Sequence, residues 1–320
     1  MNTPIKLGAY ALGLVVVFGG TFAVGGLVGP QGTTAKAPGA HATHGGTEQA
    51  ARTASVPGGL QVSQDGYTLV PETTTVTPAE RADFRFTVTG PDGKPVTRYT
   101  KLHGKWLHLI VARRDMSGFQ HVHPSLGADG VWSVPLELPD PGVYRFFTDV
   151  QPEGVKEQLT LGTDITAPGD YQPEPLPAAA PVATVGDYAV RLEGALTPGR
   201  SSRLKLTVEK DGRPVTDIQP YLEAYGHLVA LREGDLAYLH VHPDGEPGDG
   251  RTRPGPGITF FAEVPSTGTY RLYLDFKHGD KVRTAEFTVR TAGAAAAPEQ
   301  PSGEASEGAG GGEGHGDHTH

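Results

Sequence analysis

The chain carries a pattern of histidines that occurs twice with the same spacing. Each copy has one histidine, then two more separated by a single residue and followed by proline, so that positions 108, 121, 123 and 124 recur as 227, 240, 242 and 243. Neutral imidazoles suit copper(II), zinc or nickel, whereas calcium and magnesium demand oxygen ligands. We therefore predict that a set of histidines binds metal: His108, His121, His123, His227, His240 and His242.

Strand geometry would bring the histidines of each copy together. Side chains two apart on a strand point to the same face, so His121 and His123 form a row. A hairpin turn at 113–118 places His108 on that face, opposite one of the pair. In the second copy, a two-residue turn at 233–234 would set the first histidine directly across from the second and diagonal to the third.

Copper is the predicted ion, and zinc is the second choice. Nitrogen ligands bind copper(II) more tightly than the other divalent first-row ions. The chain has no cysteine, which excludes a blue-copper centre, zinc fingers and thiol nucleophiles. Met116, on the first turn, could supply a soft ligand for copper(I). Five histidines nearer the ends of the chain could capture metal loosely: His41, His44, His315, His318 and His320.

Other interpretations of these residues stay open. An H-x-H pair on a strand is common on exposed sheet faces, and a duplicated His-Val-His-Pro could persist because it builds a hydrogen-bonded corner. Asp149 and Asp275, which recur between the copies, could orient a ligating imidazole, cap a turn or pair with an arginine. His103 and His278 have no counterpart in the other copy, and we expect both to be ordinary surface residues.

Short strands are the elements expected to position the histidines. Beyond the histidines, residues 92–97 (DGKPVT) recur as 211–216 (DGRPVT), and Tyr144 recurs as Tyr270. Alternating polarity and turn residues predict strands in the first copy near 67–70, 82–89, 105–112, 119–123, 131–138, 142–150 and 157–162. The predicted fold class is all-β, with two tandem immunoglobulin-like or cupredoxin-like β-sandwich repeats and both tyrosines in the core or corner of a sandwich.

Composition divides the chain into ordered and solvated parts. Glycine and proline account for 45 and 28 of the 320 residues, which predicts long unstructured stretches. Segments almost free of large apolar residues cannot bury enough surface to order themselves. The predicted order is a membrane anchor at 1–30, a tether at 31–59, the first repeat at 60–170, a proline-rich linker at 171–184, the second repeat at 185–290 and a Gly/His-rich tail at 291–320.

The first segment predicts the location of the protein. Residues 7–28 carry no charge and would span about 33 Å as a helix, which matches the hydrocarbon layer of a bilayer. Lys6 precedes this run, which favours a cytoplasmic N-terminus. We expect an N-terminal transmembrane helix in a single-pass protein of the cell membrane, with its C-terminal domains extracytoplasmic. The alternative is secretion after signal cleavage near 35–37.

Charge and motifs argue against several functions. The net charge of −9 leaves no basic stripe that could displace counterions from nucleic acid. The sequence has no Gly-x-Ser-x-Gly elbow, no phosphate-binding glycine loop and no His-Glu-x-x-His helix. We therefore expect that the protein is not an enzyme and has no small-molecule substrate.

Two histidine-containing segments carry a family resemblance. The segments are WLHLIVARRDMSGFQHVHP and GHLVALREGDLAYLHVHP. Together with the duplicated β-domain and the anchor, they resemble a group of actinobacterial exported or membrane-anchored proteins, described as secreted or heavy-metal-associated. The resemblance implies an extracytoplasmic role linked to copper. The predicted function is copper sequestration or delivery, with a copper transporter or cuproprotein as partner; the alternative is a metal-free adhesion or scaffold module of the cell envelope.

Overall fold

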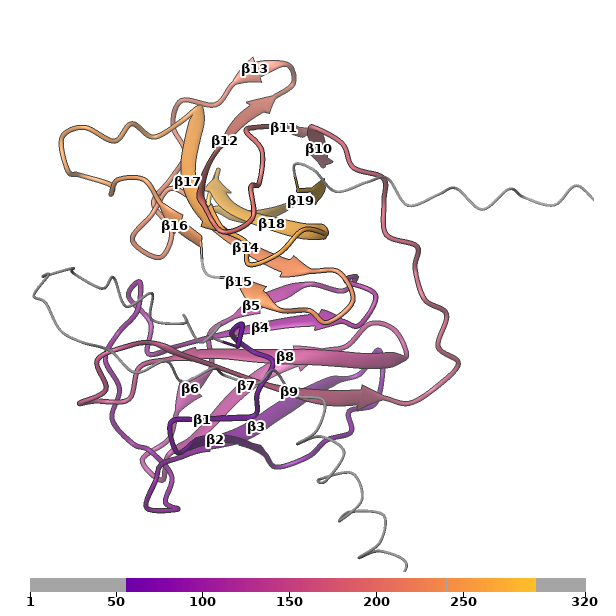
Figure 1. Cartoon of the computed structure of the whole chain (residues 1–320), viewed down its shortest axis with the longest axis vertical. Helices are drawn as coiled ribbons and strands as arrows, with labels where there is room; N and C mark the ends of the chain where they lie inside the picture. Colours follow the sequence, from indigo (N-terminus) through magenta and orange to yellow (C-terminus); the bar gives the residue numbers. More distant parts are fainter. Residues whose placement is uncertain (1–55, 240, 292–320) are drawn as a thin grey trace, which may run out of the picture. The chain divides into compact units, whose positions relative to one another are not determined.

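The structure is a computed structural model that describes residues 56–239 and 241–291, and every regular element in that part is a β-strand (Figure 1). The side chain of His242 is also outside the description. The predicted anchor, most of the predicted tether and the tail histidines therefore lie outside the described residues, as does His240. Among the described residues, no helix has the length and apolar character needed to cross a membrane.

The first repeat is a sandwich of two antiparallel sheets. One sheet has the order β1-β2-β3-β7-β6, with bounds β1 (Ser63–Gln64), β2 (Tyr67–Pro71), β3 (Arg81–Thr89), β6 (Ser125–Leu126) and β7 (Val131–Glu137). The other has the order β5-β4-β8-β9, with bounds β4 (Leu107–Arg113), β5 (Gln120–Val122), β8 (Gly142–Val150) and β9 (Leu159–Ala167). Phe84, Phe86 and Val88 alternate along β3 and are buried between the sheets, as the period of a half-buried strand requires.

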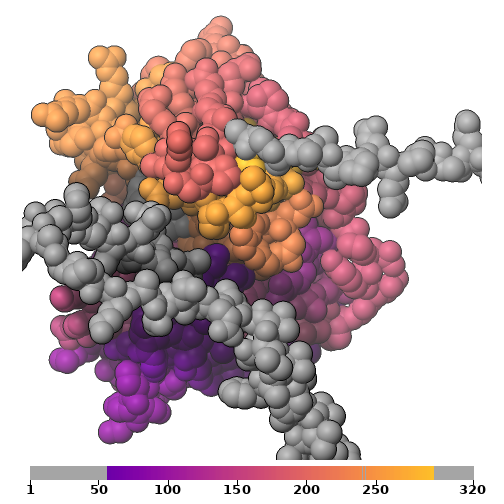
Figure 2. All heavy atoms as spheres, in the orientation of Figure 1, coloured from indigo at the N-terminus to yellow at the C-terminus, as the bar shows by residue number. Residues whose placement is uncertain are grey.

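The second repeat has the same plan and its own core. Its first sheet has the order β10-β11-β12-β17-β16, with bounds β10 (Val182–Val185), β11 (Tyr188–Glu193), β12 (Ser201–Lys210), β16 (Val241–Pro243) and β17 (Gly257–Glu263); β13 (Arg213–Pro214) pairs with β12. The second sheet has the order β15-β14-β18-β19, with bounds β14 (His227–Arg232), β15 (Tyr238–Leu239), β18 (Thr269–His278) and β19 (Lys281–Arg290). β10 thus begins inside the predicted linker. Colour follows the sequence in Figure 2, running from indigo through magenta in the first repeat and from rose to yellow in the second.

Both repeats close a corner with a tyrosine, which confirms the expectation for Tyr144 and Tyr270. Each ring is fully buried, and each hydroxyl donates to a main-chain carbonyl four residues earlier, at Asp140 and Ser266, with O···O distances of 2.9 Å. The hydroxyl of a buried tyrosine needs such a partner. The corner therefore fixes the loop before β8 and before β18 in the same way.

The predicted two-residue turn of the second copy is wrong. β14 and β15 pair Ala230 with Leu239 and Leu231 with Tyr238, and the main-chain bonds of Arg232 close a loop over 233–236. The longer loop shifts the register by two residues, so that the extended ladder would no longer set position 227 across from 240. The chain then changes sheets, because β16 pairs with β17 instead of β14.

The two repeats share an apolar interface within one compact unit. Phe119 of the first repeat stacks on Tyr273 of the second, with ring centroids 3.9 Å apart, and Phe147 lies 5.5 Å from Tyr238. The surrounding buried residues are Ile110, Ala112 and Met116 from the first repeat and Val229, Leu231 and Leu236 from the second. Full burial of one large apolar side chain contributes about 1.5–3 kcal/mol. The interface therefore contributes substantially to the stability of the folded chain.

The end of the predicted tether is part of the interface. The main chain of Gly58 bridges to Tyr238 of the second repeat, and Gly59 N–H donates to the carbonyl of Thr160 in the first. The Gly59 carbonyl accepts from Nε and Nη2 of Arg145 at 3.1 and 2.6 Å. A Cβ on Gly162 would overlap that carbonyl oxygen. Only glycine at 162 therefore leaves room for this segment.

We expect Gly162→Ala to displace the 58–59 segment, because the new methyl group cannot share space with the Gly59 carbonyl. Loss of the bonds to Arg145 would lower the free energy of unfolding by about 1–3 kcal/mol. Urea denaturation measures the loss, and amide hydrogen exchange at Tyr238 should quicken. Gly90→Ala is the control, since its Cβ would meet no atom closer than 3.4 Å. Equal stability of both variants would contradict the described docking.

Candidate metal centre

His108 is held by a tight turn that precedes its strand. Its Nε2 lies 2.8 Å from the carbonyl oxygen of Leu102, so Nε2–H donates and the lone pair of the neutral ring is at Nδ1. Leu102 and Lys105 exchange two main-chain bonds, and the residues between them, His103 and Gly104, have φ of 48° and 75°. Two positive φ values are typical of a type I′ turn. The turn thus orients the His108 ring.

The first predicted triad meets on one face. β4 and β5 pair Ile110 with His121, which places His108 and His121 on the same side of the sheet. His108 Nδ1 lies 3.0 Å from His121 Nε2 and 3.2 Å from His123 Nε2, and the candidate ligand atoms of these three residues lie within 4.8 Å of one another. Two nitrogens bound to zinc at about 2.0 Å in a tetrahedral site are about 3.3 Å apart. The spacing therefore fits a small transition-metal ion.

A carboxylate from the other repeat orients His121. Its Nδ1 lies 2.7 Å from Asp275 Oδ2. Both side chains are buried, with 6% of the histidine and 5% of the aspartate exposed. Thr284 donates to the other carboxylate oxygen at 2.6 Å. Since the carboxylate accepts, Nδ1 of His121 carries the proton, and the lone pair of the neutral ring is at Nε2. When the His121 ring is neutral, His108 Nδ1 and His121 Nε2 face each other with two lone pairs, an arrangement that a cation between them stabilises.

Burial keeps two rings of this triad neutral. Desolvation lowers the pKa of His108 to about 4, against the opposing effect of the bond to Leu102. Desolvation, together with repulsion from His121 and His108, lowers the pKa of His123 to about 2. A group whose charged form has lost its hydration gives up the proton more readily. At neutral pH the lone pairs of these rings are therefore available to a metal.

One member of the second predicted triad joins the first. His227 Nε2 lies 2.9 Å from the Tyr221 carbonyl and 3.0 Å from the Leu222 carbonyl, which repeats the arrangement at His108. Burial lowers its pKa to about 4, and its ring centroid is 6.2 Å from that of His121. The position of His240 and the side chain of His242 are outside the described residues; the main chain of His242 pairs with Phe261 in β17.

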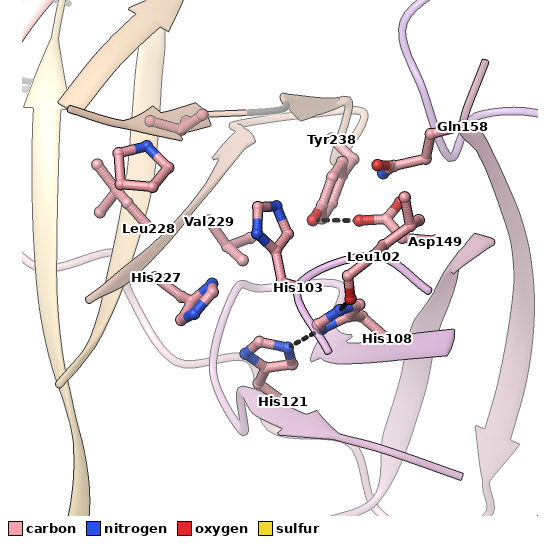
Figure 3. A pocket seen from close by; sticks show the side chains of 12 residues that line it. Leu102, His103, His108, His121, Asp149, Gln158, His227, Leu228, Val229 and Tyr238 are labelled. Carbon is pink, nitrogen blue, oxygen red and sulfur yellow. Dashed lines mark hydrogen bonds between the residues drawn. The ribbon is translucent and has the colours of Figure 1, made fainter. Parts of the chain in front are cut away.

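His103 is a site residue that the sequence analysis missed. It lines a cavity of ≈ 40 Å³ together with His108, His121 and His227 (Figure 3), and its ring centroid is 5.5 Å from that of His227. The expectation of an ordinary surface residue is therefore wrong. The His103-Gly104 pair between Leu102 and Lys105 was the available signal, because histidine tolerates positive φ better than most residues and glycine adopts it freely.

Other predicted residues have structural contacts. His278 is half-buried, and its Nδ1 lies 2.8 Å from the Tyr188 hydroxyl, so it is not an ordinary surface residue either. Met116 packs in the apolar interface, 4% exposed. Asp149 accepts from the hydroxyls of Tyr238 at 2.7 Å and Thr160 at 2.6 Å. Asp149 and Asp275 thus each accept a bond from the opposite repeat.

Fold and site together define a duplicated β-sandwich protein with a histidine cluster where its repeats meet. The chain belongs to the family described as Domain of unknown function (DUF8832), whose model matches residues 61–167 and 183–293. The two matches correspond to two copies of one domain. A comparison with curated proteins finds no match.

Several solved structures show similarity at low identity. A DUF4426 family protein (PA0388) from Pseudomonas aeruginosa is 13% identical, with a TM-score of 0.26, and the match covers 34% of this chain and 94% of that one. The Escherichia coli adhesin FdeC is 13% identical, with a TM-score of 0.23 and coverage of 72% and 65%. InvD of Yersinia pseudotuberculosis is 14% identical, with a TM-score of 0.24 and coverage of 72% and 58%. This chain thus spans less than two thirds of the FdeC and InvD structures.

The buried neutral imidazoles predict a loss of stability in acid. A free imidazole titrates near 6.5, whereas His108 and His227 titrate near 4 in the folded chain. Between these values the unfolded chain binds more protons, so stability is complete above about pH 6.5 and falls toward pH 4. We expect metal-free protein to lose about 1–2 kcal/mol per buried histidine between pH 7.5 and 5. Urea denaturation with a chelator present measures this.

A variant checks the assignment of that loss. His227→Gln removes one titrating ring and should flatten the dependence on pH by the contribution of one histidine. If the urea concentration at the midpoint of unfolding of the wild type stays constant between pH 7.5 and 5, the burial of these neutral rings is contradicted.

Proposed function

We propose that the protein binds copper through His108, His121 and His123, and that it sequesters or delivers the ion outside the cytoplasm. The single observation that supports this is the convergence of three nitrogens within 4.8 Å, two of them with the opposite ring nitrogen committed to an acceptor. A ligating histidine usually donates its other N–H to a carbonyl or a carboxylate. Leu102 and Asp275 are acceptors of these two kinds.

Copper is preferred over zinc for this donor set. The described ligands are all imidazole nitrogens, and such a site binds copper(II) more tightly than zinc. The chain offers no thiolate, which zinc sites often use. Zinc is the second choice, because tetrahedral zinc accepts three histidines and a fourth ligand.

We also propose binding without catalysis. The cavity beside the triad measures ≈ 40 Å³, enough for an ion and a water molecule, whereas pockets for organic ligands are about 300 Å³ or more. The remaining parts of the proposal come from the sequence: an N-terminal membrane anchor, extracytoplasmic repeats, and a copper transporter or cuproprotein that exchanges the ion. A metal-free adhesion or scaffold role is the competing function, and the titration below separates the two.

We expect the full chain to bind copper(II) at one tight site in isothermal titration, above weaker binding by the tail histidines. His121→Gln with His123→Gln should remove the tight site, because only His108 of the three proposed ligands would remain. The loss in affinity should be at least 100-fold, since each histidine ligand contributes several kcal/mol to a preformed site.

Tail variants are the matched control. His315→Gln with His318→Gln also removes two imidazoles, but neither is among the three proposed ligands, so the tight site should persist. If the wild type shows no tight site, or if both double variants bind alike, the copper function is wrong and the scaffold function is favoured.

We expect Asp275→Asn to weaken copper binding about 10- to 100-fold, because the amide no longer anchors the His121 ring through a charged acceptor. Competition with a chelator of known affinity measures the change. Asp217→Asn is the control for loss of a carboxylate beside a histidine: Asp217 lies 3.2 Å from His278 Nε2, outside the cluster and with an exposed side chain. Equal affinities in the two variants would show that Asp275 has no role in orienting a ligand.

A further inference from the structure

The cavity beside the triad adjoins a larger one. The larger cavity measures ≈ 650 Å³, and His103 and Pro243 line both. His103 belongs to the turn that orients His108, and Pro243 ends β16 of the second repeat. The two cavities are therefore separated by the His103 side chain and the end of one strand.

The larger cavity is lined by acidic side chains. Glu223 and Glu246 line it and are exposed, and no lysine or arginine is among the described residues that line it. Neither carboxylate forms an ion pair with a described residue. A Cβ on Gly104 would lie 3.4 Å from Glu223 Oε1, so this carboxylate lies over the turn that carries His103. Walls of one sign concentrate counter-ions.

The His103 side chain is free to bind an ion. Its ring is half-buried and makes no hydrogen bond to a described residue. Its centroid lies 5.5 Å from that of His227 and 6.2 Å from that of His108. Figure 3 shows the ring among His227, His108 and His121. An ion bound to this ring would be within a few ångströms of the next imidazole.

We propose that copper enters through the larger cavity, where Glu223 and Glu246 attract it, and that His103 passes it to the triad. This inference rests on the proposed copper site. The ligand is a transition-metal cation released by a weak carrier, and His103 is a transfer residue that does not belong to the final set of ligands.

Stopped-flow mixing of the full chain with the 1:1 copper(II)–glycine complex, which is a monocation, tests the route. The visible ligand-field absorption of the loaded site gives the rate, and chelator competition gives the affinity. Glu223→Gln with Glu246→Gln should slow loading at least threefold at low salt and reduce its dependence on ionic strength, with affinity almost unchanged. Glu80→Gln with Glu233→Gln is the control, because it removes two exposed charges from turns outside both cavities.

His103→Asn tests the transfer residue. Asparagine tolerates the positive φ of this position, so the turn should persist. Loading should slow at least threefold while the affinity changes less than threefold. Loss of tight binding would make His103 a ligand, and unchanged rates in both test variants would exclude the route; either result overturns this inference and leaves the copper site standing. If the wild type binds no copper, the proposed function itself fails.

Discussion

The site depends on how each imidazole divides its two nitrogens between a fixed acceptor and a shared centre. His108 and His121 each donate from one nitrogen, to Leu102 and to Asp275, and present the other nitrogen at a separation of 3.0 Å. In water such rings would turn away from each other. Here the rings cannot turn without giving up a buried hydrogen bond, which costs about 1–3 kcal/mol. The fold therefore holds these two ring nitrogens in an arrangement that favours a cation between them.

That position needs both repeats. The acceptor of His108 is local, whereas the acceptor of His121 lies on β18 of the second repeat, 154 positions along the chain. Phe119, which directly precedes β5, stacks on Tyr273 of β18 at the same interface. The apolar packing between the repeats and the hydrogen bond that orients His121 are therefore coupled. A change that weakens the packing would also disturb that hydrogen bond.

Much of the fold follows from local patterns, and the arrangement between the repeats does not. Strands such as β3 are readable because Phe84, Phe86 and Val88 alternate with solvated residues. The shared face of His108 and His121 is predictable because side chains alternate between the two faces along both strands of a hairpin. The loop at 233–236 is not readable, because Glu233 and Gly234 alone also suit a shorter turn.

The pairings across the interface lie beyond any local pattern. The contact of Asp275 with His121 and the approach of His227 depend on how two finished sandwiches pack, which no spacing along the chain encodes. His103 was missed for a related reason. Comparison of the repeats favours residues that both copies keep, and His103 has Leu222 as its counterpart. Comparison of two copies therefore overlooks functional residues that occur in only one of them.

Gly162 and Glu286 make the halves of the chain non-interchangeable. Gly162 lies two residues beyond Thr160, the partner of Asp149, and Glu286 lies two residues beyond Thr284, the partner of Asp275. At position 162 the absence of a side chain leaves room for the Gly59 carbonyl, which accepts from Arg145. At position 286 the glutamate carboxylate itself accepts from the guanidinium of Arg271. Transposing the repeats would set a glutamate against the incoming main chain. The two halves of the chain therefore have a fixed order along the polypeptide.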